Sequence, residues 1–237
     1  MGGVAREVDL LVQSSDRRRV PGVGPQDRAT PDGDPVLRLY RRLLDLVDVQ
    51  VAVDVLAGTS AGGINAALLG LVNARRLDLR PLRDIWLSAG ALNQLLRDPR
   101  EADPPSLLKG DGQLLTALTA GITTIVAGRG ETASPRRTDV FITTTLLSPE
   151  SSKFLDDYGT QIVDTDHHGQ FHFDENSLGK PGVETPLALA ARSSASFPAA
   201  FEPSFIPFGT ATDAAHPDMS CYSNATRSHW AAEAVCS

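Results

Sequence analysis

Apolar residues recur at helical spacing in the first part of the chain. Val4, Val8, Leu11 and Val12 fall on one face and predict an opening helix. Residues 14–34 are rich in Ser, Arg, Pro, Gly and Asp, a composition that predicts a long loop. A second helix is expected to start at Asp34-Pro35, because aspartate caps helices and proline fits the first helical position. Its apolar face consists of Val36, Leu37, Tyr40, Leu43, Leu44 and Val47.

The middle of the chain changes from a strand pattern to a helix pattern within a few residues. A β-branched, apolar run at residues 51–56 stops at Gly58, and Ser60 then lies between two glycines. Ile64, Ala67, Leu68 and Leu71 follow at helical spacing. This order predicts a strand, a sharp turn that carries the serine, and a helix.

Helix and strand patterns continue to alternate in the rest of the chain. Helices are expected at residues 83–97, 113–127 and 186–193, and a strand is expected at residues 139–145. Residues 154–163 and 170–173 predict a hairpin around residues 164–169. The alternation favours an α/β fold with a mainly parallel central sheet flanked by helices. The apolar face of helix 113–127 could line a groove for a fatty chain, but a core role is favoured.

Size and charge narrow the class of protein. The 237 residues, 41% of them hydrophobic, predict a single globular domain over residues 1–237. The formal net charge of -7 argues against a nucleic-acid partner. The opening residues lack a signal-peptide core, and the apolar stretch at residues 114–128 contains four threonines and is too short to span a bilayer. We therefore expect a cytoplasmic protein, with peripheral contact to a membrane left open.

The glycine-flanked serine is the main candidate for chemistry. Gly58-Thr59-Ser60-Ala61-Gly62 matches the pattern Gly-x-Ser-x-Gly in the strand-to-helix context that this pattern requires. Such a turn raises the hydroxyl at a helix N-terminus, where the helix dipole favours developing negative charge. Ser60 is thus predicted to be a nucleophile in acyl transfer. Both motif glycines are expected where packing leaves no space for a Cβ atom.

Four segments carry a family resemblance. Residues 54–65, Asp-Val-Leu-Ala-Gly-Thr-Ser-Ala-Gly-Gly-Ile-Asn, closely resemble the nucleophile segment of patatin-like phospholipases. Residues 189–201, which contain Ser196-Phe197-Pro198, resemble the segment beside the family's active site. Residues 226–232 and 1–7 are similar to a bacterial branch. The resemblance implies a three-layer α/β fold, a Ser–Asp dyad, an acyl-enzyme, a lipid-ester substrate, and neither cofactor nor metal.

The chain departs from that pattern at both ends. The family's glycine-rich oxyanion loop and its strand should precede the first helix, so we expect the first strand to be missing and the domain to be incomplete. Where the family has Asp-Gly-Gly, the chain reads Glu233-Ala234-Val235-Cys236-Ser237. Glu233 falls at the aspartate position and is the candidate base, within an aberrant C-terminal tail at residues 233–237. The resemblance therefore implies a hydrolase whose activity is impaired.

Two other functions remain open. One is a catalytically inactive lipid-binding or interaction remnant. The other is a Ser-His-Asp esterase, since Asp213 or Asp218 followed by His229 has the chain order of an ordinary α/β-hydrolase.

Two polar clusters have simpler explanations. His167-His168 with Asp164 and Asp166 could suggest a metal site, but the cluster has the composition of a hairpin turn. Residues 17–19, three arginines, could contact phosphate head groups, although a solvated loop is favoured. We therefore expect no metal.

Overall fold

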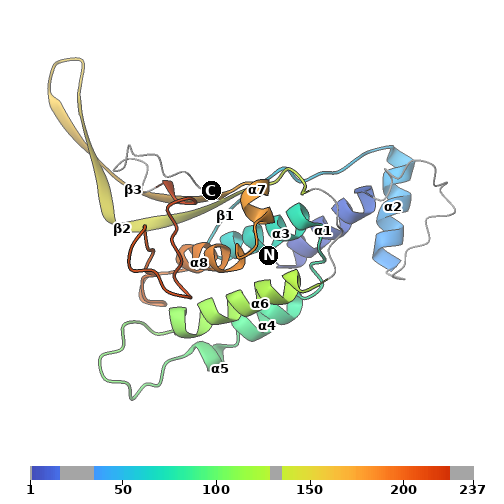
Figure 1. The fold of residues 1–237 in the computed structure, drawn as a ribbon, viewed down its shortest axis with the longest axis horizontal. Coiled ribbons are helices and arrows are strands. Elements are labelled where there is room, and N and C mark those ends of the chain that lie inside the picture. Colours follow the sequence, from blue (N-terminus) through green and yellow to red (C-terminus); the bar gives the residue numbers. More distant parts are fainter. Residues whose placement is uncertain (1, 17–34, 129–134, 225–237) are drawn as a thin grey trace.

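The computed structural model describes residues 2–16, 35–128 and 135–224, which form helices stacked against one sheet (Figure 1). In chain order the elements are α1 (Gly2–Asp16), α2 (Pro35–Val47), β1 (Val55–Thr59), α3 (Ala61–Arg75), α4 (Leu82–Ala89), α5 (Leu92–Leu95), the π-helical segment η2 (Gly110–Leu115), α6 (Thr116–Val126), β2 (Asp139–Leu155), β3 (Gln161–Phe173), α7 (Glu175–Gly179) and α8 (Glu184–Ser194). The predicted α/β class is confirmed.

The sheet of the described residues has three strands in the order β1-β2-β3. β1 pairs parallel with β2 from Val55↔Asp139 to Thr59↔Thr143, whereas β2 and β3 form a long antiparallel hairpin. The expected parallel pairing is present, and β3 makes the sheet mixed. In Figure 1 the outer part of the β2–β3 hairpin projects far beyond the body of the molecule.

Helices α3, α8, α4 and α6 lie in two layers under the sheet. α3 and α8 pack against β2, and α4 and α6 form the next layer (Figure 1). α3 is buried on every side from Gly63 to Ala74, which explains why its sequence is almost uniformly apolar. Val140, Ile142, Phe171 and Phe173 are the sheet side chains that face these helices, and each is at least 98% buried. The sheet and α3 together therefore hold the turn that follows β1, at residue 60.

The β2–β3 hairpin turns at a different place from the one predicted. The turn comprises residues 156–160, so residues 164–169 lie inside β3 and not in a turn. Asp156 fixes this turn, because its Oδ1 accepts hydrogen bonds from the backbone N–H groups of Tyr158 and Thr160. Gly159 supplies the positive φ of 79° that the turn needs.

Other element boundaries also differ from the prediction. The strand expected at residues 139–145 continues to Leu155 as β2, and the helix expected from residue 113 begins inside the π-helical segment η2. α1 continues through residues 14–16, where the Ser14 hydroxyl donates back to the Leu10 carbonyl at 2.8 Å. β1 begins at Val55 and not at residue 51, because pairing with β2 starts there. The helix expected at residues 83–97 is interrupted at Gly90 into α4 and α5. No helix among the described residues is long and apolar enough to cross a membrane.

Candidate active site

Ser60 is the single residue between β1 and α3. Its backbone has φ 56° and ψ -126°, a strained conformation for a residue with a side chain. Its side chain makes no capping hydrogen bond to the backbone of α3, so the Oγ atom is not engaged by the helix that follows it. The strand, turn and helix thus follow the predicted order, and the hydroxyl is presented on a sharp turn.

The glycines around Ser60 are not equivalent. A Cβ atom at Gly58 would overlap the Gly62 carbonyl and lie 2.7 Å from the Gly63 nitrogen. A Cβ at Gly62 would meet nothing within 4 Å, so the expectation of a packing role is wrong for this glycine. Gly63 has the close packing instead, because a Cβ there would lie 2.9 Å from Ser194 Oγ and 3.1 Å from Ile142 Cγ2.

The end of α8 supports the serine turn. The backbone N–H of Ser60 donates to Ser194 Oγ at 2.8 Å, and Ser194 Oγ donates to the Thr143 carbonyl at 2.6 Å. Thr59 and Thr143, which face each other across β1 and β2, share a short hydroxyl hydrogen bond of 2.5 Å. The sequence did not single out Ser194, although it lies in the Ala/Ser-rich segment before Ser196-Phe197-Pro198.

The N-terminus of α3 supplies the electrostatic field at Ser60. The first N–H groups of a helix have no intrahelical acceptor, and they form the positive end of the helix dipole. In α3 these groups belong to Ala61, Gly62 and Gly63, and no side chain of Ser60 caps them. The Ala61 N–H directly follows Ser60 and is the first of these groups.

Ser60 opens onto a cavity of about 1400 Å³, which lies at the carboxyl end of β1 and beside residues 143–148 in the middle of β2. That volume exceeds the range of about 300–1000 Å³ typical of small-ligand sites. Its apolar lining comes mainly from the loop after α8 and from β2. The residues concerned are Leu146, Leu147, Phe197, Pro198, Phe201, Phe205, Ile206 and Phe208. This arrangement suits a ligand with a polar reacting group at Ser60 and a long apolar part.

Ionisable groups also line the cavity, but none bonds to the serine. Asp166, His167 and His168 lie on the β3 side, and His167 Nδ1 is 2.7 Å from the Leu146 carbonyl oxygen. Within the described part of the chain, Ser60 Oγ forms no hydrogen bond to a base. The two candidate bases, Glu233 and His229, lie outside the described residues.

The aspartates of the alternative triad have local partners. Asp213 Oδ1 accepts from the backbone N–H groups of Ala215 and His216, and Asp218 Oδ1 accepts from that of Gly209. Neither aspartate is among the residues that line the cavity. No group of three or more His, Cys, Asp or Glu side chains suited to a metal occurs among the described residues.

Comparison with known proteins identifies the family. A family model described as patatin-like phospholipase matches residues 37–218. The chain belongs to the patatin-like phospholipase family. The match includes the Ser60 turn, the cavity-lining loop and α8, and it ends before the region of Glu233. Family membership supports a lipid acylhydrolase at the family level.

A bacterial relative covers almost the whole chain. The uncharacterized membrane protein Rv3479 of Mycobacterium tuberculosis (strain ATCC 25618 / H37Rv) is 47% identical over 245 aligned positions. The alignment covers 98% of this chain and 23% of that protein, so the chain spans about a quarter of the relative's length. No solved structure matches the chain.

Proposed function

We propose that the chain hydrolyses acyl esters of lipids, with Ser60 as the nucleophile. The observation that carries this proposal is the placement of Ser60 on a strained turn, at the N-terminus of α3 and at the wall of a large apolar cavity. A strained turn persists only where the surrounding structure holds it, and such turns cluster at functional sites. Membership of the patatin-like phospholipase family supports the same chemistry.

The proposed reaction is a two-step acyl transfer through Ser60. A base removes the hydroxyl proton as Oγ attacks the ester carbon, and the carbonyl oxygen becomes negatively charged. The positive end of the α3 dipole, which begins directly after Ser60, would stabilise that charge. The alcohol leaves with a proton from the protonated base, and an acyl-serine remains. Water, deprotonated by the same base, then attacks the acyl carbon, releases the fatty acid and restores the hydroxyl.

Glu233 is the proposed base, on the strength of its position in the sequence alone. A glutamate has a longer side chain than the aspartate that the family resemblance implies, so its carboxylate would approach Ser60 from a different distance. We expect slow turnover for this reason. No cofactor takes part in the proposed reaction, and the substrate would be drawn from a membrane by peripheral contact of a cytoplasmic protein.

Point variants test the nucleophile and the base separately. Hydrolysis of a medium-chain p-nitrophenyl ester should disappear in Ser60→Ala and fall at least about a hundredfold in Glu233→Ala. Full activity in folded Ser60→Ala would refute the proposal. Activity that survives Glu233→Ala but is lost in His229→Ala would replace the carboxylate base with a histidine.

Lipid binding without turnover is the second candidate function. It is favoured by one observation, the large cavity with a mainly apolar lining, which suits a fatty chain whether or not Ser60 reacts. Under this function, fatty-acid binding would be equal in the wild type and in Ser60→Ala, and neither protein would release an alcohol from an ester. The same two proteins therefore separate the candidates.

A further inference from the structure

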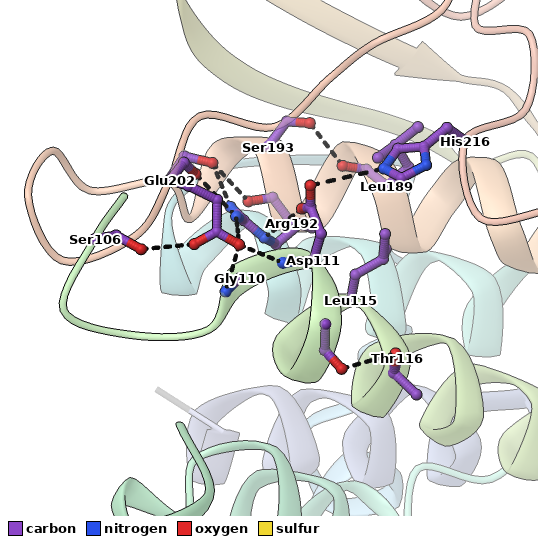
Figure 2. Close-up of polar contacts among 12 residues, drawn as sticks. Ser106, Gly110, Asp111, Leu115, Thr116, Leu189, Arg192, Ser193, Glu202 and His216 are labelled. Atoms are coloured by element: carbon purple, nitrogen blue, oxygen red, sulfur yellow. Dashed lines mark hydrogen bonds and ion pairs between the residues drawn. The ribbon is translucent and has the colours of Figure 1, made fainter. Parts of the chain in front are cut away.

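A buried guanidinium lies behind the apolar wall of the cavity. The side chain of Arg192, two residues before Ser194 on α8, is completely buried. Its Nη1 donates to Ser196 Oγ at 2.5 Å, and its Nη2 donates to the Glu202 carbonyl oxygen at 2.9 Å. Its Nε lies 3.2 Å from Asp111 Oδ1 (Figure 2). Arg192 thus binds both ends of the loop at residues 196–202.

Glu202 fixes the far end of this loop to the segment before α6. Its carboxylate accepts hydrogen bonds from Ser106 Oγ at 2.7 Å and from the backbone N–H groups of Gly110 and Asp111 at 2.8 and 2.9 Å (Figure 2). Arg97 adds a contact at 3.2 Å. Burial alone would raise the pKa of Glu202, but these donors outweigh it and lower the pKa to about 2. Glu202 therefore carries its charge at neutral pH.

The loop between the two anchors is the cavity wall. Ser196, Phe197, Pro198, Ala199 and Phe201 all line the cavity that contains Ser60. The Arg192 Cζ atom lies 5.4 Å from the centre of the Phe201 ring, so the cation also supports the wall from behind. Gly110 is required here, because a Cβ atom would overlap the Arg192 guanidinium.

The end of α8 therefore holds the nucleophile and the wall together. Ser194 accepts the Ser60 N–H, while Arg192, one half-turn earlier, holds the loop. We propose that Arg192 and Glu202 are positioning residues that set which acyl-chain length the cavity accepts, by fixing the wall formed by residues 196–202 relative to Ser60. This inference rests on the proposed acyl-ester function for the identity of the ligand.

Glu202→Gln is the principal test, because it keeps the shape of the side chain and removes the negative charge that accepts the hydrogen bonds at the far end of the loop. Glu101→Gln is the matched control, since exposed Glu101 contacts the same Arg97, at 3.3 Å, and does not line the cavity. Equilibrium dissociation constants are measured for octanoic, dodecanoic and hexadecanoic acid, and kcat/KM is measured for the corresponding p-nitrophenyl esters. Circular dichroism establishes that each variant is folded.

The wild type should prefer one chain length, and Glu202→Gln should reduce that preference by about tenfold, the scale of discrimination that an apolar pocket provides. Glu101→Gln should keep it. An unchanged preference in folded Glu202→Gln, or a wild type that binds all three acids equally, overturns the inference. If Glu202→Gln does not fold, Ser196→Ala decides by the same comparison, because it removes one contact of Arg192 without removing a charge.

The binding measurement separates this inference from the proposed function. A wild type that selects among fatty acids but hydrolyses none of the esters refutes the hydrolase proposal and leaves the positioning role of Arg192 and Glu202 to be decided by the variants' dissociation constants. A merely structural role would lower affinity for all chain lengths by the same factor. A role in positioning the wall changes the ratio between them.

Discussion

The two glycines that flank Ser60 should respond in opposite ways to alanine. Gly58→Ala places a Cβ atom against the Gly62 carbonyl and 2.7 Å from the Gly63 nitrogen, all of it backbone that cannot rotate away. Overpacking of this kind costs typically about 1–3 kcal/mol, and a backbone obstacle favours the upper end. Gly62→Ala adds a methyl group into open space within α3, where alanine is about 0.5–1 kcal/mol better than glycine.

Urea denaturation followed by circular dichroism measures both free energies of unfolding against the wild type. We expect Gly58→Ala to lose about 3 kcal/mol and Gly62→Ala to gain a few tenths or more. The two variants differ only in which glycine of the motif gains a methyl group, so each is the other's control. Equal losses in both, or a larger loss in Gly62→Ala, would refute the packing argument for the turn.

The remaining predictions concern the support of the site and the pH dependence of stability. Ser194→Ala removes the acceptor of the Ser60 N–H, so we expect the free energy of unfolding in urea to fall by about 1–2 kcal/mol and kcat/KM to fall as well. Unchanged values of both would refute the role of Ser194 in holding the turn. Burial raises the pKa of Asp9 from 3.8 to about 6, so the folded state holds this proton more tightly and the free energy of unfolding should fall as pH rises from about 4 to 6. Asp9→Asn should abolish that fall, and a wild-type curve that is flat or rising there would contradict it. The pKa of Glu202 is lowered from 4.5 to about 2, so its contribution to the free energy of unfolding should be complete above pH 4.5 and lost as pH falls toward 2. The same loss of stability between pH 4.5 and 2 in Glu202→Gln would contradict this.

Much of the fold is readable in the local pattern. The turn at Ser60 was predictable because a β-branched run, two glycines and an apolar helix follow one another within twenty residues. The pattern likewise predicts α6 and the first part of β2, but not the continuation of β2 from residue 146 to Leu155. The hairpin turn was misplaced because Asp164 to Gly169 has a turn-like composition, whereas the turn is fixed by Asp156, whose side chain binds two backbone N–H groups.

The support of the site depends on contacts between segments far apart in the chain. Ser194 contacts Ser60 across 134 positions, and Glu202 contacts Gly110 across 92. No periodicity or composition records such pairings. In the sequence, Arg192 is one basic residue in an Ala/Ser-rich segment. Its burial and its contacts exist only because α8, η2 and the loop after α8 meet there.

The central claim is that Ser60 is an activated nucleophile, and active-site-directed labelling tests it most directly. The folded wild-type protein is incubated with a fluorophosphonate, and the adduct is located by peptide mass spectrometry, with Ser60→Ala as the control. We predict one adduct, on Ser60, and none in Ser60→Ala. A folded wild type that forms no adduct, or an adduct at another residue that persists in Ser60→Ala, would contradict the account.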